Sequence, residues 1–287
     1  MPNCVNLGRI SEIEKRLESI DIERRGLAAE LSALRASRSN DATLPLLGFQ
    51  ALATPPKTPD EKIELFLSLF RSRESVCPKL WINQAKGTKG YSPACRNEWV
   101  RGVCGKPQVK CTACPNQAFP KLDAQAVRAH LMGGDTIGTY AIRENDTCVF
   151  LAADFDGAGW AQDAIAYKAA ARELGVQAEL ERSRSGDGCH AWIFFSEPIL
   201  ARWARQLGTV IVARAIASRH AIKLETYDRF FPNQDFLPKG GFGNLIALPL
   251  QKASRDAGNT VFLKEDLTPF EDQWAALAGF MRLTGSE

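Results

Sequence analysis

An apolar run that ends in two carboxylates, Val149–Asp156, is the feature that most constrains this chain. Its valine, phenylalanine, leucine and alanine residues predict a buried strand over 147–154. Because side chains alternate along a strand, Asp154 and Asp156 point to one face, and Phe155 points to the core on the other. Two carboxylates on one face repel each other unless a cation lies between them, and such oxygen ligands suit Mg²⁺ or Mn²⁺. The plainer interpretation is an acidic turn after a strand, since Asp and Gly favour turns.

A glycine-bearing turn over 182–192 is the second candidate site. Arg182, Arg184 and Ser185 lie before its glycines, and His190 follows them. Glycine lets backbone amides approach a phosphate closely, and arginine matches phosphate oxygens in charge and geometry. The turn therefore predicts a triphosphate-binding loop. The alternative is a hairpin loop with ordinary surface arginines and a structural histidine.

A third carboxylate site lies between residues 225 and 235, before a loop rich in proline and glycine and a hydrophobic strand over 244–250. Without the other two segments, this region would be interpreted as an ordinary loop. With them, it offers a third carboxylate ligand for a metal ion. Asp228 is the best candidate, and Glu225 and Asp235 are its rivals.

Four of the eight cysteines lie within 20 residues of one another. In a chain without an export signal, such a cluster indicates a metal site before a disulfide framework, because the cytosol keeps thiols reduced. The cluster supplies the four thiolates of a closed structural zinc site. They are Cys95, Cys104, Cys111 and Cys114. We predict a zinc knuckle over 77–119, in which Cys77 or His130 could replace one ligand. An iron–sulfur cluster, or four reduced thiols in a small core, are the alternatives.

The chain is expected to contain three regions. Apolar residues recur at three- and four-residue spacing over 7–36, which predicts a coiled-coil helix; the alternative is an amphipathic helix folded back on its own domain. Residues 37–59 are rich in Ser, Thr, Asn and Pro and predict a linker. The main domain spans 60–287 and begins with a helix that Thr58 caps. Its patterning predicts an α+β domain, with α/β as the alternative. The expected strands are 137–142, 147–154, 177–181, 189–195 and 244–250, and the expected helices are 160–174 and 200–219.

Charge and hydropathy limit the partners and the compartment. Lys and Arg exceed Asp and Glu by 36 − 33 = 3, which permits a polyanionic partner but does not demand one. No stretch approaches the roughly 20 apolar residues of a membrane span, and the first residues do not form a secretory leader. We therefore expect a cytoplasmic protein with no membrane partner.

Three segments, in this order, resemble the signature of the archaeo-eukaryotic primase superfamily: a strand-borne pair of acids, a Ser-to-His element, and a single acid after a hydrophobic residue. In this chain they are Asp154 with Asp156, residues 185–190, and Asp228 after Tyr227. More closely, four further segments are similar to the primase-polymerase domain of TOTE conflict systems, at residues 86–95, 114–119, 231–235 and 243–250. CRISPR-associated primase-polymerases are near relatives. The resemblance covers about residues 60–285.

The resemblance implies an RRM-like catalytic core, with the zinc knuckle as an insertion. Such a core joins nucleoside triphosphates into primers, or extends primers, on a single-stranded DNA template. Asp154, Asp156 and Asp228 would hold two Mg²⁺ or Mn²⁺ ions for phosphoryl transfer. His190 and Ser185 would hydrogen-bond the triphosphate of the incoming nucleotide. Further nucleotide-binding candidates are Arg184, Arg182 and Lys239. By analogy with zinc elements in other primases, the knuckle would contact the template or the initiating nucleotide.

Functions of two other classes remain as alternatives. One is a metal-dependent nuclease or an untemplated nucleotidyltransferase that uses the same acids. The other is a non-catalytic, zinc-containing nucleic-acid-binding module. The N-terminal helix is expected to pair with a second copy of the chain, or with a helicase or nuclease of the same system.

Overall fold

The computed structural model of the chain describes residues 54–219 and 224–284, the backbone of residues 49 and 50, and nine residues between 9 and 26. The chain divides into two compact units, residues 1–46 and 47–287. In the first unit, the nine described residues are all helical and exposed. The rest of the coiled coil predicted over 7–36, and most of the linker predicted over 37–59, lie outside the described residues.

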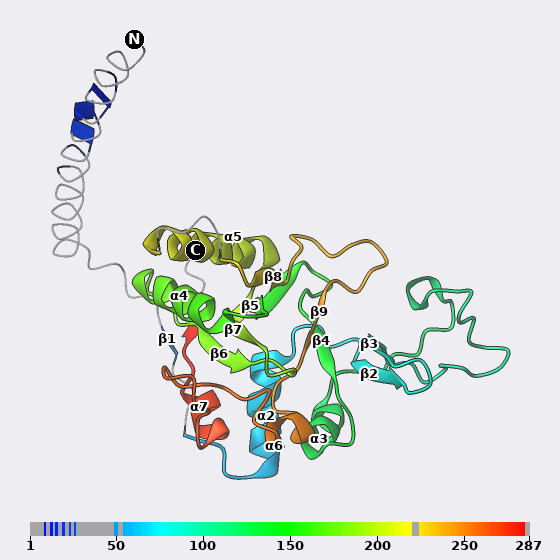
Figure 1. The fold of residues 1–287 in the computed structure, drawn as a ribbon. Helices are drawn as coiled ribbons and strands as arrows, with labels where there is room; N and C mark the ends of the chain where they lie inside the picture. The colour runs from blue at the N-terminus through cyan, green and yellow to red at the C-terminus, as the bar shows by residue number, and fades with distance from the viewer. Residues whose placement is uncertain are drawn as a thin grey trace. The chain divides into compact units, whose positions relative to one another are not determined.

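A six-stranded sheet forms the centre of the second unit (Figure 1). Strand β5 (Thr147–Asp156) lies between β7 (Gly188–Leu200) and β8 (Tyr227–Phe231), and both pairings are antiparallel. On the other side of β7, β6 (Glu179–Arg182) pairs with its first half and β10 (Arg282–Leu283) with its second half. The sheet is therefore mostly antiparallel, as expected for an α+β domain, and its two longest strands lie side by side.

A short strand inside the predicted linker joins this sheet. β1 (Phe49–Gln50) pairs antiparallel with β10, near the other end of the chain. Residues 37–59 therefore do not serve only as a linker. The sequence carried no local signal for β1, because its pairing partner lies more than 200 residues away.

Helices cover both faces of the sheet (Figure 1). Helices α4 (Trp160–Glu173) and α5 (Ala201–Ser218) pack on one face, in the positions predicted from sequence. The other face carries α2 (Pro59–Phe70), with α3 (Ala124–Met132) and α7 (Gln273–Gly279) beside it. The predicted cap of α2 is confirmed: Thr58 accepts a hydrogen bond from the Glu61 amide, and Glu61 accepts one from the Thr58 amide.

Strand alternation gives the two faces of the sheet different contents. Odd-numbered residues of β5, such as Phe155, face α4, where the ring of Phe155 contacts Tyr167. Even-numbered residues of β7, such as Trp192, face α2, where Phe70 packs edge-on against the indole. The α2 face is thus apolar along most of the sheet. It becomes polar near the end of β5, where Asp154 and Asp156 lie beside His190 and Glu181 of the neighbouring strands.

Two small antiparallel sheets complete the unit. β2 (Pro78–Asn83) pairs with β3 (Thr88–Pro93), and β4 (Gly138–Tyr140) pairs with β9 (Leu245–Ala247). The strands predicted over 137–142 and 147–154 are both present and are joined by a short turn, but they do not pair with each other. Instead β5 is occupied on both edges by β7 and β8. The remaining described elements are the 3₁₀ turn Cys111–Ala113 and α6 (Lys252–Asp256).

None of the helices among the described residues combines the length and the apolar character that crossing a bilayer requires.

Gly208 gives a test of the contact between α5 and the sheet. A Cβ at this position would lie 2.7 Å from Phe230 Cζ and 2.9 Å from Leu151 Cδ2. Helix propensity alone predicts that Gly208→Ala stabilises the protein by about 1 kcal/mol. We expect the opposite, a net loss of about 1 kcal/mol or more in the free energy of unfolding, because overpacking a dense core costs about 1–3 kcal/mol.

Urea unfolding measures the effect, and Gly279→Ala is the matched control. A Cβ at Gly279, at the end of α7, would meet no atom within 4 Å, so this change should be neutral or slightly stabilising. A Gly208→Ala variant as stable as the Gly279→Ala variant would contradict the close packing of α5 against β5 and β8.

Candidate active site

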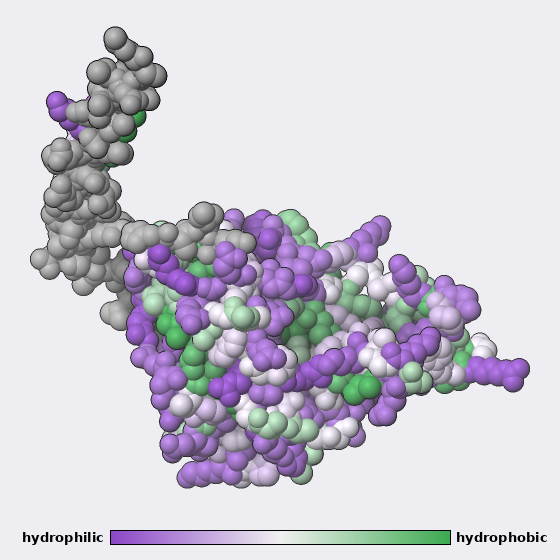
Figure 2. All heavy atoms as spheres, viewed as in Figure 1, coloured by the Kyte–Doolittle hydropathy of each residue, from purple (hydrophilic) through white to green (hydrophobic). Residues whose placement is uncertain are grey.

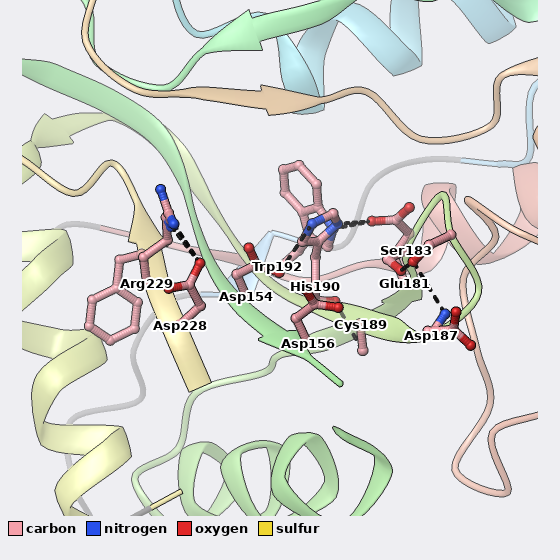
Figure 3. Close-up of polar contacts among 12 residues, drawn as sticks. Asp154, Asp156, Glu181, Ser183, Asp187, Cys189, His190, Trp192, Asp228 and Arg229 are labelled. Atoms are coloured by element: carbon pink, nitrogen blue, oxygen red, sulfur yellow. Dashed lines mark hydrogen bonds and ion pairs between the residues drawn. The ribbon is translucent and has the colours of Figure 1, made fainter. Parts of the chain in front are cut away.

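The two aspartates of β5 stand beside the candidate phosphate-binding loop. Asp154 is the cross-strand partner of His190, and Asp156 is the partner of Gly188 (Figure 3). The two strands approach so closely here that a Cβ at position 188 would lie 2.6 Å from the carbonyl oxygen of Phe155. Glycine at 188 is therefore required for this pairing. The Asp156 carboxylate accepts a hydrogen bond from the Gly157 amide at 3.0 Å.

A β-bulge brings the third carboxylate to the same place. In the pairing of β5 with β8, Asp154 is opposite Arg229, but Phe155 is opposite Tyr227, so Asp228 is the extra residue. Such a bulge re-aims a side chain that regular alternation would send to the other face. Figure 3 shows Asp228 beside Asp154, with its carboxylate 2.7 Å from Nε of Arg229. The structure thus brings Asp228 to the two predicted acids.

His190 is held by a buried carboxylate that the sequence interpretation missed. Nδ1 of His190 lies 2.6 Å from Oε2 of Glu181, and the indole Nε1 of Trp192 donates to the same oxygen at 3.2 Å. Nε2 of His190 lies 3.6 Å from Oδ1 of Asp154. Glu181 therefore holds the imidazole with Nε2 directed to the aspartates (Figure 3). The available signal was a glutamate in a strand that the sheet buries, since a buried carboxylate needs a partner.

The charges of this cluster are strongly coupled. Burial raises the pKa of Asp154, and the neighbouring charges of Asp228 and Asp156 raise it further, whereas His190 acts in the other direction. Burial by itself would lower the pKa of His190, but Glu181 and Asp154 outweigh it, so that the pKa of the imidazole is raised. A site of this kind favours bound cations, because each added positive charge relieves repulsion among the carboxylates.

The loop between β6 and β7 presents small polar groups next to His190. The hydroxyls of Ser183 and Ser185 are 3.0 Å apart, and the Asp187 amide donates to Ser185 at 3.3 Å. Gly186 adopts φ 88°, a left-handed conformation that favours glycine. Arg184 is half-buried, and its carbonyl accepts from Asn259. The predicted loop is therefore present, with Ser185 exposed at its tip.

Arg182 is not brought into this cluster. On β6, Arg182 is the neighbour of Glu181 and is opposite Cys189, so its side chain lies on the other face of the sheet from His190. Its guanidinium donates to the carbonyls of Gly258 and Leu267, each at 3.1 Å. The position of Arg182 therefore does not match the expectation that it binds phosphate. Sequence spacing alone could not reveal which face of the sheet its side chain occupies.

The structure gives three other sequence candidates different surroundings. Asp235 forms an ion pair with Arg205 of α5. Lys239 is exposed in the loop between β8 and β9, and among the described residues it has no hydrogen bond or ion pair. Glu225 precedes β8 by two residues. Of the three rival acids, it is Asp228 whose charge acts on Asp154.

The four clustered cysteines line one small cavity. Cys95, Cys104, Cys111 and Cys114 all contribute to a cavity of about 20 Å³ that also includes Lys106. All four are free thiols. The two alternative ligands, Cys77 and His130, do not line this cavity. The thiol of Cys77 is buried near the carbonyl oxygen of the next residue, Pro78. His130 is buried as well, with its two ring nitrogens within hydrogen-bond distance of the Pro249 carbonyl and the Ile137 amide.

Neither cluster is arranged as a finished metal site. Across the described part of the chain, the side chains of His, Cys, Asp and Glu do not form a group of three or more that could hold one metal ion. Within each cluster, the side chains would therefore have to rotate for three of them to bind one metal ion.

Comparison with known proteins assigns the family. Residues 61–287 match the family model described as "TOTE conflict system, Archaeo-Eukaryotic Primase domain". One similar solved structure is the polymerase domain from Mycobacterium tuberculosis ligase D in complex with DNA, at 14% sequence identity and a TM-score of 0.40. That similarity covers 82% of this chain and 92% of that chain. No curated protein matches. The TM-score is too low to support further inference, whereas the family match covers most of the chain and agrees with the resemblance seen in the sequence. The chain belongs to the archaeo-eukaryotic primase domain family of TOTE conflict systems.

Proposed function

We propose that this protein is a template-directed primase-polymerase, which joins nucleoside triphosphates into primers or extends primers on single-stranded DNA. Family membership supports nucleotidyltransferase-type activity. The observation that carries the proposal is the meeting of Asp154, Asp228 and His190 on three adjacent strands at one end of the sheet. In such a cluster, the carboxylates can bind metal ions and the imidazole can bind a phosphate group. Phosphoryl transfer requires both.

The donor set of the three aspartates fits Mg²⁺ or Mn²⁺. These ions prefer carboxylate oxygens, and the carboxylate of Asp154 is partly buried among like charges, with 21% of its side chain exposed. Asp154, Asp156 and Asp228 would hold two ions, which supply charge neutralisation and a more acidic attacking hydroxyl when bound. Arg229 pairs with Oδ2 of Asp228 through both contacts, which leaves Oδ1 of that carboxylate for a metal ion.

The residues next to the acids would bind the nucleotide. Glu181 orients His190 as a hydrogen-bond donor, and Nε2 would donate to a phosphate oxygen of the triphosphate. Ser185 and the backbone of the loop around Gly186 would add further donors. Arg184 would balance the phosphate charge. These residues act mainly by positioning the triphosphate in line with the attacking hydroxyl.

The cysteine cluster would hold a structural zinc ion. Its four thiols share one cavity, and the segment around them contains few regular elements besides the short turn Cys111–Ala113. Four thiolates are the ligand set of a closed zinc site. The knuckle would then contact the template or the initiating nucleotide. The N-terminal helix would pair with a second copy, or with a helicase or nuclease.

Substitution of the acids tests the proposed reaction. Asp154→Ala and Asp228→Ala should each reduce nucleotide incorporation by at least about 100-fold, since even residues that only support a metal ligand are worth about 10- to 100-fold. Asp235→Ala is the control and should stay within a few-fold of the native rate, because Asp235 pairs with Arg205. The assay is a gel with a primed and an unprimed template, Mn²⁺, and labelled ribo- or deoxyribonucleotides.

The same gel separates the alternatives. Cleavage of the template would indicate a nuclease, additions that ignore the template would indicate an untemplated transferase, and no reaction would indicate a binding module. Loss of activity in Asp235→Ala but not in Asp228→Ala would overturn the assignment of the third acid.

Two arginines of opposite placement test the nucleotide site. Arg184→Ala should raise the KM for the nucleoside triphosphate about tenfold or more, because charge-assisted hydrogen bonds to phosphate are strong. Arg182→Ala should instead lower the free energy of unfolding by about 1–3 kcal/mol while leaving KM nearly unchanged, since its guanidinium binds two backbone carbonyls. Steady-state kinetics and urea unfolding distinguish the two, and the reverse pattern would contradict these roles.

Metal analysis tests the knuckle. The purified full chain should contain about one zinc ion, and Cys111→Ser or Cys114→Ser should remove it. Cys77→Ala is the control and should retain the metal, because Cys77 does not line the cavity. Iron in place of zinc would indicate an iron–sulfur cluster, and a metal-free chain with four reactive thiols would exclude both.

A further inference from the structure

The positive charge of the chain is concentrated in one segment, residues 78–121, which we call the basic lobe. It contains eight Lys and Arg residues and one acid, Glu98, so its net charge is 8 − 1 = +7. The whole chain has a net charge of +3, so the remainder is 3 − 7 = −4. The lobe comprises β2, β3 and the cysteine cluster, and Figure 2 shows hydrophilic side chains projecting from this part of the surface with hydrophobic patches between them.

Most of these charges are available to a partner. Lys79 forms an ion pair with Asp135, and Lys106 forms one with Glu98. The other six basic side chains are exposed and form no ion pair within the described part of the chain. They are Lys86, Lys89, Arg96, Arg101, Lys110 and Lys121. Such a surface attracts a polyanion by releasing the polyanion's counterions.

Large apolar side chains are exposed among these charges. Of the thirteen large hydrophobic side chains that are exposed among the described residues, six lie in the basic lobe, and two of them are tryptophans. The side chain of Trp81 is 44% exposed and that of Trp99 is 67% exposed. A large apolar side chain such as tryptophan is costly to leave in water. Two exposed tryptophans in a lobe of net charge +7 therefore indicate a partner that carries negative charge and flat apolar faces.

Trp81 is held flat on the β2–β3 hairpin. It is opposite Gly90, and a Cβ at position 90 would lie 2.9 Å from Cζ2 of the indole. The indole therefore covers the backbone of Gly90, where a larger residue would push it away. One side of the ring is supported by the strand, and the ring remains about half exposed.

Trp99 is held at the surface beside the cysteine cavity. Its backbone adopts φ 61°, a left-handed conformation that is rare for a residue of this size. Nζ of Lys106 lies 5.7 Å from the centroid of the ring and 2.7 Å from the carboxylate of Glu98. Lys106 itself lines the cysteine cavity, so the position of the indole is tied to the zinc-binding segment.

We propose that Trp81 and Trp99 are base-stacking residues of a single-stranded nucleic acid site formed by the basic lobe. Single strands expose the faces of their bases, whereas a duplex stacks them against one another, so aromatic side chains can reach them only on a single strand. The six exposed cations bind the phosphates, and the indoles bind the bases. A protein partner fits less well, because lysine is depleted from protein–protein interfaces. The inference deepens the proposed function by locating where the template binds.

Binding without catalysis tests this site. The full chain is titrated into fluorescein-labelled (dT)₂₀, or a 20-base-pair duplex, without nucleotide, Mg²⁺ or Mn²⁺, and anisotropy is recorded. Trp81→Ala and Trp99→Ala should each raise the Kd for (dT)₂₀ at least about fivefold. The reason is that a base that loses its stacking on an aromatic ring weakens binding by about that factor or more. Both should leave duplex binding unchanged. Lys86→Ala with Lys89→Ala should flatten the dependence of log Kd on log salt concentration for both ligands.

Three control variants keep the test decisive if an alanine variant folds poorly. Trp81→Phe and Trp99→Phe retain an aromatic ring and should bind (dT)₂₀ within about threefold of the native chain. Trp203→Ala removes an indole of similar exposure, 54%, which lies on α5 with the guanidinium of Arg202 over its ring, and this change should have no effect on binding. Alanine variants that bind (dT)₂₀ like the native chain, or that lose duplex and single strand equally, would overturn the inference.

The failure of this inference and that of the proposed function give different results. Tryptophan-dependent binding of (dT)₂₀ by a chain that incorporates no nucleotide would support the site and overturn the polymerase proposal. Incorporation of nucleotides by a chain whose single-strand binding ignores both tryptophans would do the reverse.

Discussion

Side-chain alternation along β5 and β7 is the constraint on which the site depends. On the face toward α2, residues of these strands pass from large apolar rings, Phe150 and Trp192, to the polar groups Asp154 and His190. Phe70 of α2 and Phe150 of β5 both pack against Trp192, and burial of these rings on one face favours the observed register. The register in turn sets the cross-strand pairing of Asp154 with His190. A slip of β5 by one residue would turn Asp154 toward α4 and α5, away from His190. The buried rings therefore determine where the charges meet.

Much of this arrangement could be predicted from sequence, for a physical reason. A run of apolar residues predicts a strand, and strict alternation then assigns the face of Asp154 and Asp156 without any knowledge of tertiary structure. The cap of α2 at Thr58 was equally local. Asp228 was less secure, because its position depends on a bulge in β8, and an extra residue in a strand has no signature in composition.

Long-range pairings account for what the sequence did not reveal. Glu181 and Arg182 are adjacent in the chain, yet the pairing of β6 with β7 sends the first to His190 and the second to carbonyls on the opposite face. Their chemistry suggested the reverse, since an arginine near a glycine turn resembles a phosphate ligand and a glutamate does not. The strand β1 in the expected linker depends on a partner at the other end of the chain in the same way. Residue type alone cannot predict on which face of the sheet such a side chain lies, because the pairing with the neighbouring strand determines it.

Charge is distributed unevenly between the basic lobe and the rest of the chain. The aspartates that suit cations repel a nucleic acid backbone, and the chain outside the basic lobe carries a net charge of −4. Under the proposed function, the basic lobe rather than the acids would attract a template strand. Tyr91 of β3 belongs to the basic lobe, and its buried hydroxyl has no hydrogen-bond partner within the described part of the chain. Burial raises the pKa of Tyr91, and the charges of Arg184 and Glu181 act on it in opposite directions. The hairpin that carries Trp81 therefore places a buried hydroxyl within electrostatic range of Glu181, the carboxylate that holds His190. The proposed single-strand site and the proposed phosphate site are thus connected through this one hairpin.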